Sequence, residues 1–422
     1  MLELSDADAG NLSGDNGPVT KFAARMVVRA AELLSASELI DVSFVHIDAC
    51  HYYGQAHVDF AQMIVDGGVK VAVPSWTNTV PVSVELPDMR PPEKSPEFLK
   101  GARDLMTLYE QMGCRPVWTC APYQLPGGPG LGEQIVGSES NAVTYYNSAV
   151  GARTNKYGDF LDVCCALLGR VPNAGLHRTE NRRGQILFRL ADDVPDALRH
   201  QEMLAHVLGH RVGKAAGSGI PVIDGLPSET SLDSLKAISA ATAASGGVAL
   251  FHAVGVTPEA PDQETAFQGR EPEREVVLGI EELRAARDEL STARPGALEM
   301  VALGTPHFSF TEFARLAELM DGVKVSPGLV MYVSTSRHVR ELIAGKGWLD
   351  QLERAGVRIV VDTCTYFTPA VRGANGRVMT NSAKWAYYAP GMLPVEVCFG
   401  SLEDCVRSAV AGEVKRDESL WQ

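Results

Sequence analysis

The chain has 422 residues, of which 45% are hydrophobic and 21% charged, and its formal net charge is −14. This composition predicts a globular protein with two or three packed lobes and excludes the disordered, collagen-like and membrane-protein classes. The acidic excess argues against a nucleic-acid partner, and the polar N-terminal segment, with no apolar run of about 18 residues anywhere, predicts a cytoplasmic protein that no membrane holds.

Short apolar runs alternate with amphipathic stretches along the chain. Helices are predicted at 19–36, 228–245 and 310–322, where apolar residues recur at helical spacing or helix-forming residues follow a cap. Several apolar runs are rich in valine and isoleucine, as strands covered on both faces are. The predicted strands are 43–47, 69–74, 115–119, 184–190, 220–224, 247–254, 298–304, 328–333, 357–363 and 395–399.

This alternation of strands and helices predicts an α/β fold of several lobes, with mainly parallel sheets covered by helices. We place approximate lobes at 1–170, 171–290 and 291–422. The polar segment 258–275 interrupts the pattern and is expected to be an exposed loop or linker.

Two cysteines stand where predicted strands give way to loops that contain proline. Cys120 lies in WTCAPY and Cys364 in DTCTYFTP. In α/β folds reactive residues collect at the ends of strands, and cysteine thiolates hold iron–sulfur clusters from positions far apart in sequence. The alternative is a pair of ordinary buried thiols. None of the eight cysteines forms a CxxC pair, so a metal site has to be assembled from distant positions.

A second cluster of reactive side chains follows the first predicted strand, in the segment HIDACHYYG. It brings together His46, Asp48, Cys50 and His51, which are all metal-ligand or proton-carrier types. The alternative interpretation is a loop in which His46 faces the core and His51 faces water.

The segment 128–160 is dense in hydrogen-bonding side chains, among them Glu139, Ser140 and Arg153. Arg153 suits a substrate carboxylate because its planar guanidinium binds both oxygens. A capped surface helix is the alternative. Lys384, in TNSAKWAYYAPG, is either an anion-binding residue or a lysine whose stem lies on aromatic rings. His307, in GTPHFS, is expected to be structural.

At these residues the sequence resembles the large subunit of the aconitase X family. The resemblance runs over nearly the whole chain, and its most specific segments are GEQIVGSESNAVTYYNSAVGARTNKYGDF, FHAVGVTPEA, VDTCTYFTP and NSAKWAYYAPG. It implies an iron–sulfur hydro-lyase whose cluster lies in a crevice between α/β lobes. It also implies a heterodimer, because the family's small swivelling domain, thought to carry the catalytic serine, has no counterpart in this sequence.

The resemblance carries the family's cluster ligands over to Cys120 and Cys364. Thr305 stands where the archaeal branch of the family has a third cysteine, and threonine is a poor replacement for a thiolate. The resemblance therefore implies a smaller cluster, for which we favour the two-iron type, or a replacement ligand such as Cys50.

The residues at the family's substrate-binding positions are Ala49, Cys50, His51, Asn78, Thr79, Glu139, Ser140 and Lys384. We add Arg153 to this set because its guanidinium suits a carboxylate. Glu139, Ser140 and Lys384 are the expected catalytic residues of this chain, with the main base on the partner. Glu139 is expected to bind a substrate amine or to relay a proton.

The altered loop at 46–52 and the threonine at 305 argue against a phosphorylated mevalonate substrate. They favour the bacterial activity, the dehydration of cis-3-hydroxy-L-proline to 1-pyrroline-2-carboxylate. The alternatives are a dehydratase of another small hydroxy acid, such as mevalonate 5-phosphate, and a non-catalytic metabolite-binding homologue.

Overall fold

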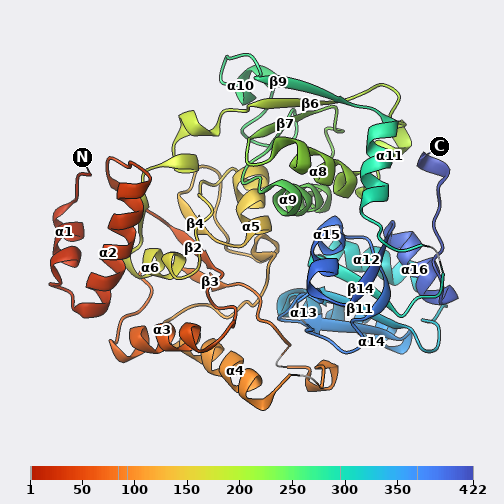
Figure 1. The fold of residues 1–422 in the computed structure, drawn as a ribbon, viewed down its shortest axis with the longest axis horizontal. Coiled ribbons are helices and arrows are strands. Elements are labelled where there is room, and N and C mark those ends of the chain that lie inside the picture. Colours follow the sequence, from red (N-terminus) through yellow and green to blue (C-terminus); the bar gives the residue numbers. More distant parts are fainter. Residues whose placement is uncertain (1, 84, 93, 295, 368, 422) are drawn as a thin grey trace.

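The computed structural model describes all residues except 1, 84, 93, 295, 368 and 422. The chain forms three α/β lobes that meet at the centre of the molecule (Figure 1). Each lobe contains a parallel sheet, with strand orders β3-β2-β4, β8-β7-β6-β9 and β12-β11-β10-β13-β14. These sheets confirm the predicted fold class. No helix of the described residues is long and apolar enough to cross a membrane.

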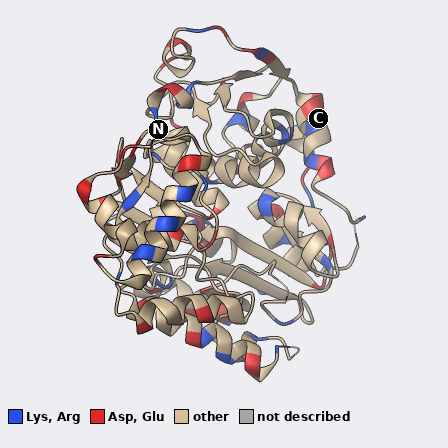
Figure 2. Cartoon of the chain, turned by 60° about the vertical axis from the view of Figure 1, so that its left-hand side comes forward, with Lys and Arg blue, Asp and Glu red and all other residues tan. Residues whose placement is uncertain are grey.

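The first lobe is built around a short sheet of three strands and an antiparallel pair, β1 with β5. Its elements are α1 (Asp6–Ser13), α2 (Pro18–Leu33), β1 (Leu39–Asp41), β2 (Phe44–Ile47), α3 (Gln55–Asp66), β3 (Ser75–Thr77), α4 (Pro96–Gln111), β4 (Ile135–Gly137), α5 (Ser140–Tyr145), α6 (Leu161–Leu168) and β5 (Arg170–Pro172). Acidic and basic residues both lie on the outer helices (Figure 2).

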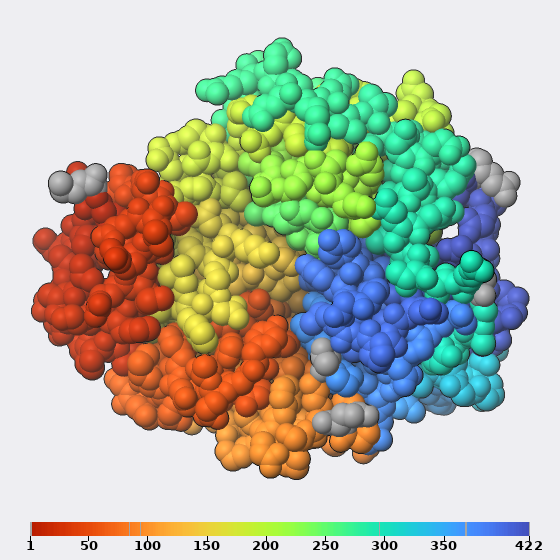
Figure 3. Space-filling model, in the orientation of Figure 1, coloured from red at the N-terminus to blue at the C-terminus, as the bar shows by residue number. Residues whose placement is uncertain are grey.

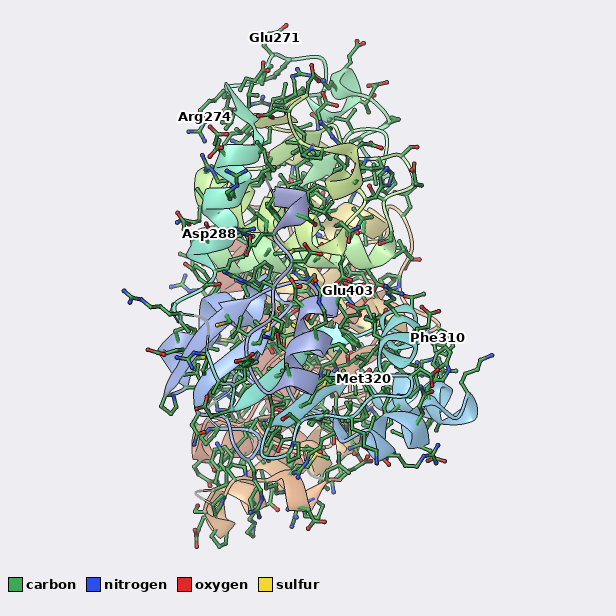
Figure 4. All side chains as sticks on the ribbon, turned by 90° about the vertical axis from the view of Figure 1, so that its right-hand side faces the viewer. Glu271, Arg274, Asp288, Phe310, Met320 and Glu403 are labelled. Atoms are coloured by element: carbon green, nitrogen blue, oxygen red, sulfur yellow. The ribbon has the colours of Figure 1, made fainter. Side chains whose placement is uncertain are left out.

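The second lobe has a four-stranded parallel sheet next to the long helices α8 and α9. Its elements are β6 (Ile186–Leu190), α7 (Asp196–Arg199), α8 (Glu202–Ala216), β7 (Pro221–Asp224), α9 (Leu232–Gly246), β8 (His252–Ala253), α10 (Gln263–Ala266), β9 (Arg274–Leu278) and α11 (Ile280–Glu289). The segment predicted as a loop at 258–275 therefore contains α10 and the first residues of an exposed strand. Figure 4 shows Glu271 and Arg274 at the end of this lobe that is far from Phe310 and Met320 of the third lobe.

The third lobe is a five-stranded parallel sheet with nearly every central strand residue buried. Its elements are β10 (Met300–Phe308), α12 (Phe310–Leu319), β11 (Val330–Thr335), α13 (Arg337–Gly345), α14 (Trp348–Arg354), β12 (Val357–Val361), β13 (Gly376–Thr380), α15 (Ala383–Met392), β14 (Val395–Phe399) and α16 (Leu402–Ala411).

Two of the predicted strands are wrong, and six strands of the described residues were not predicted: β1, β3, β4, β5, β9 and β13. In the segment 69–74 the N–H groups of Val71 and Ala72 donate to carbonyls of Met112 and Ala166, so the segment is tied to the ends of helices instead of a sheet. The segment 115–119 makes one bridge to β3 and then bends at Trp118, whose φ is +44°. β13 escaped prediction because its first residues, Gly376 and Arg377, continue a polar loop.

The three lobes share buried surface through one helix of the second lobe. α9 packs against α8 of its own lobe, α5 of the first lobe and α15 of the third. One apolar cluster accordingly runs from Leu204 and Ile238 to Trp385 and includes Cys120 and Cys364. In the space-filling view the blue third-lobe segment lies directly against the yellow end of the first lobe (Figure 3). The place where these segments meet contains the candidate site.

Candidate active site

Two cysteine side chains from different lobes meet in the interior of the protein. Cys120 follows the bend at Trp118 in the first lobe, and Cys364 follows β12 in the third lobe. Their Sγ atoms are 3.6 Å apart, although 244 residues separate them in the chain. Both thiols are free, and the two residues are 2% and 1% exposed. This arrangement is a candidate metal centre, because two sulfurs at this distance can bind one metal ion or cluster together.

His307 connects the two cysteine loops. Its Nδ1 accepts a hydrogen bond from the Thr119 hydroxyl (2.9 Å), and its Nε2–H donates to the Thr363 carbonyl (3.1 Å). Its backbone N–H also donates to Cys120 Sγ (3.4 Å). His307 has a ring nitrogen within ligand distance of the cysteine pair. Since both ring nitrogens are already hydrogen-bonded, the histidine holds the two loops in place in this arrangement.

The two thiols share their protons unequally. Burial raises the pKa of Cys120, but the hydrogen bond from the Cys364 thiol, with help from Lys384 and the His307 N–H, outweighs burial and lowers it overall. The same hydrogen bond, followed by burial, raises the pKa of Cys364. Cys120 is therefore the more readily deprotonated thiol of the pair. A thiolate is the form of cysteine that binds metals.

Lys384 and Glu139 form a buried ion pair beside the sulfurs. Lys384 Nζ lies 2.5 Å from Glu139 Oε1, and the two side chains are 2% and 8% exposed. The other oxygen, Glu139 Oε2, accepts the backbone N–H of Ala142 (2.6 Å) as the N-cap of α5. Burial raises the pKa of Glu139, but Lys384 and the amide hydrogen bonds lower it overall. Both members of the pair are charged.

The N-terminus of α15 places Lys384 in the site. Ser382 caps this helix by accepting the N–H of Trp385 (3.0 Å), and its hydroxyl donates to the carbonyl of Thr305. Thr305 is buried, and its own hydroxyl has no partner among the described residues. Gly304 precedes it with φ +84°, and a Cβ there would lie 2.0 Å from a carbonyl oxygen of β11. The turn therefore requires glycine at position 304.

A cavity of about 280 Å³ lies over the sulfurs and the ion pair. Eight of the predicted site residues line it: His51, Asn78, Thr79, Cys120, Glu139, Ser140, Cys364 and Lys384. Burial lowers the pKa of His51 to about 4, so this histidine is neutral, and its Nδ1–H donates to the Thr79 carbonyl (3.0 Å).

Four other predicted residues lie outside the walls of this cavity. Cys50 is fully buried, and its thiol donates to backbone carbonyls of Ile47 (3.3 Å) and Asn78 (3.4 Å). Ala49 is buried next to it. Arg153 donates to Thr179 (2.7 Å) and pairs with Glu259 (3.6 Å), away from the sulfurs. Thr305 lies behind the site against the cap of α15.

Other residues that line the cavity were not among the predicted site residues. Asp48 belongs to the segment HIDACHYYG, so its place at the end of β2 was a usable signal. Lys156 follows the GARTN segment. The others are Tyr53, Ser138, Tyr366, Phe367, Tyr388 and Met392.

The three α/β lobes enclose a pocket whose base is formed by two buried thiols and an ion pair. This architecture is that of an enzyme with a candidate metal centre. Family models described as the first, second and third domains of aconitase X match residues 1–180, 184–288 and 298–411. The chain belongs to the aconitase X family, and it is a hydro-lyase of that family.

The chain is similar to members of this family with different printed activities. It is 42% identical to a cis-3-hydroxy-L-proline dehydratase of Pseudomonas aeruginosa, over 99% of this chain and 72% of that protein. It is 32% identical to the phosphomevalonate dehydratase large subunit of Methanosarcina mazei, over 98% of this chain and 99% of that one. The crystal structure of Thermococcus kodakaraensis aconitase X in its holo form superposes with a TM-score of 0.86 at 27% identity, and it covers 97% of this chain and all of that one.

Proposed function

We propose that the protein is the large subunit of an iron–sulfur enzyme that dehydrates cis-3-hydroxy-L-proline to 1-pyrroline-2-carboxylate. The observation that carries the proposal is the cysteine pair, with Sγ atoms 3.6 Å apart, on the floor of a pocket that also holds Lys384 and Glu139. The substrate is supported by sequence similarity. Two relatives named cis-3-hydroxy-L-proline dehydratase are 42% and 39% identical, whereas phosphomevalonate dehydratase large subunits are 32% and 30% identical.

The residues of the pocket fit an iron–sulfur group. Both thiols are free and both face one cavity, and the lowered pKa of Cys120 favours the thiolate form that binds a soft metal. The contacts of Cys50 do not favour it as a third ligand, since its thiol donates to backbone carbonyls. With threonine at position 305, we propose a cluster of the two-iron type held by Cys120 and Cys364.

In the proposed reaction, Cys120 and Cys364 would hold the iron–sulfur group, which would supply Lewis-acid chemistry toward the hydroxyl on carbon 3 of the substrate. The chain's own residues bind and orient the substrate above the sulfurs. Lys384 and Glu139 hold a proton beside the departing hydroxide, and Ser140, whose hydroxyl donates to Glu139 Oε1 (3.3 Å), extends that hydrogen-bond path. The base that removes the α proton is assigned to the partner.

The proposed partner is the family's small subunit, which would cover the mouth of the pocket. The chain matches 99% of a protein named a large subunit but 72% and 69% of the two cis-3-hydroxy-L-proline dehydratases. Aromatic rings in successive contact border the cavity: Tyr53, His51, Phe367, Tyr366 and Tyr388. Tyr53 is 67% exposed, and such an exposed aromatic border suits a protein partner. Purification of the tagged chain from its own cells should bring down a companion of about 15 kDa, the size of one small domain.

The cluster assignment is tested by metal analysis of anaerobically purified enzyme. Cys120→Ala and Cys364→Ala should each abolish the iron, the inorganic sulfide and the visible absorbance of a cluster. Cys405→Ala is the matched control, because that cysteine is also free and fully buried but lies in α16 away from the cavity. Full iron content in both cavity variants would refute the ligand assignment.

The substrate assignment is tested by supplying cis-3-hydroxy-L-proline and mevalonate 5-phosphate to the same preparation. Formation of 1-pyrroline-2-carboxylate, detected with o-aminobenzaldehyde, supports the proposal. Turnover of the phosphorylated hydroxy acid alone would reverse it.

A further inference from the structure

The cavity contains a carboxyl group that has no counter-ion in the described chain. Glu139 is fully engaged, since Oε1 pairs with Lys384 and Oε2 caps α5. Asp48, which also lines the cavity from the first lobe, has one oxygen hydrogen-bonded to the Asn78 amide. Its second oxygen has no partner among the described residues, and no lysine or arginine there pairs with it. Glu139, predicted as a ligand for the substrate amine, is thus less available for this role than Asp48.

The loop that carries Asp48 is rigid at this point. The backbone N–H groups of Asp48 and Ala49 both donate to Asp162 Oδ2 (2.8 and 3.2 Å), which fixes the turn at the end of β2. Burial and the neighbouring Asp159 raise the pKa of Asp48 to about 7. A ligand that brings a positive charge to this carboxylate would therefore be stabilised in a site where the charged form is otherwise costly.

A cationic group of the same cavity is also without a counter-ion. Lys156 lines the cavity from the segment that follows Arg153, and its side chain makes no ion pair within the described residues. Its backbone is fixed by a bridge to Gly137 at the end of β4. In contrast to Lys384, which Glu139 neutralises, Lys156 is available to a substrate carboxylate.

We infer that the pocket recognises its substrate as a zwitterion, with Asp48 binding the ring ammonium and Lys156 binding the carboxylate. The inference rests on the proposed function and adds the two residues that select the substrate class. A cyclic amino acid carries both complementary charges. A phosphorylated hydroxy acid carries two anionic groups, one of which would have to lie against Asp48, and this repulsion excludes it.

The test compares two ring ligands that differ in one atom. L-Proline carries the ammonium, whereas (S)-tetrahydrofuran-2-carboxylate has an ether oxygen in its place and keeps the carboxylate. Their inhibition constants against cis-3-hydroxy-L-proline are measured with the anaerobically prepared holoenzyme. We expect the wild type to prefer proline by about 10-fold to 100-fold, the range of a hydrogen bond between charged groups.

Substitutions of Asp48 and Lys156 measure the contribution of each charge to ligand binding separately. Asp48→Asn keeps the shape and should remove the preference for proline while leaving the affinity for the ether within about twofold; Asp48→Ser is the second variant if the first does not fold. Lys156→Gln should weaken both ligands alike, by about 2-fold to 5-fold, as expected for an exposed ion pair. Asp159→Asn is the matched control, because this aspartate lies near Asp48 but does not line the cavity, and it should leave the preference intact.

The outcomes distinguish this inference from the proposed function. If the wild type converts cis-3-hydroxy-L-proline but binds the two rings equally, or if Asp48→Asn keeps the preference for proline, the inference is overturned and the proposed function stands. If the wild type binds neither ring and converts only a phosphorylated hydroxy acid, both are overturned.

Discussion

Replacing Lys384 with methionine should reverse the pH dependence of the contribution that Glu139 makes to the free energy of unfolding. Lys384 and Glu139 are 2% and 8% exposed and 2.5 Å apart, so removal of the lysine leaves an unpaired carboxylate in the interior. Loss of one partner of a buried ion pair typically costs about 3–5 kcal/mol in the free energy of unfolding. The pair also joins α15 of the third lobe to α5 of the first, so the lobes should separate more readily in the variant.

The sign of the pH effect follows from the pKa of Glu139. In the wild type the pKa is lowered, because Lys384 and the hydrogen bonds outweigh burial. The carboxylate therefore contributes stability above its unfolded pKa, near 4.3, and this stability is lost as pH falls through the folded pKa. In Lys384→Met only burial and the amide hydrogen bonds remain, and burial raises the folded pKa above the unfolded one. The variant then loses stability as pH rises from the unfolded pKa of Glu139 to its raised folded pKa.

Chemical denaturation of the metal-free chain between pH 3 and pH 8 measures the cost of the substitution and the direction of its pH dependence. The control is Lys214→Met, since Lys214 and Glu289 lie 2.6 Å apart but are 45% and 51% exposed, and its cost should stay below about 1 kcal/mol at every pH. The double variant Lys384→Met, Glu139→Gln should recover part of the loss by removing the stranded charge. If Lys384→Met costs no more than the control, and its stability still rises with pH, the buried ion pair does not exist as described.

Three further perturbations follow from the geometry. Gly304→Ala should lower the free energy of unfolding by about 1–3 kcal/mol, because its Cβ would lie 2.0 Å from a carbonyl of β11; Gly345→Ala, which meets nothing within 4 Å, should not. His307→Gln should lower the iron bound per chain while Cys120 and Cys364 are intact, since it loosens both cysteine loops. In the metal-free chain, diamide should oxidise these two thiols to a disulfide, so that titration after denaturation finds six thiols instead of eight; Cys120→Ala should lose none of its seven.

The α/β class could be predicted because buried parallel strands leave a strong local pattern. The runs at 298–304, 328–333 and 357–363 contain β10, β11 and β12 or their first residues, as expected for mainly apolar runs that form strands covered on both faces. The runs at 69–74 and 115–119 have the same local character, but their backbone groups bond to helix ends or bend away at Trp118. These partners lie far along the chain, and no local pattern reports them.

Site residues could be predicted where a reactive side chain stands in an unusual sequence context. They could not be predicted where their role depends on pairing with residues far along the chain. Cys120, Cys364 and Lys384 attract attention in sequence, since a thiol or a lysine at the end of a buried strand or in an aromatic segment needs a reason. Arg153 attracts the same attention, yet Thr179 and Glu259 occupy its guanidinium. Whether a charged side chain is free or already paired is a property of the assembled lobes.

That distinction explains why the available charges of the pocket come from residues that sequence reasoning did not select. The carboxylate that sequence motifs favoured, Glu139, pairs with Lys384 across the junction of the first and third lobes, and each neutralises the other. Their pairing leaves Asp48 and Lys156, both from the first lobe, as the cavity's charged groups without counter-ions in the described chain. Under the proposed function, the pair at the junction serves the reaction, and the two unpaired groups of the first lobe are the ones we infer to select the substrate.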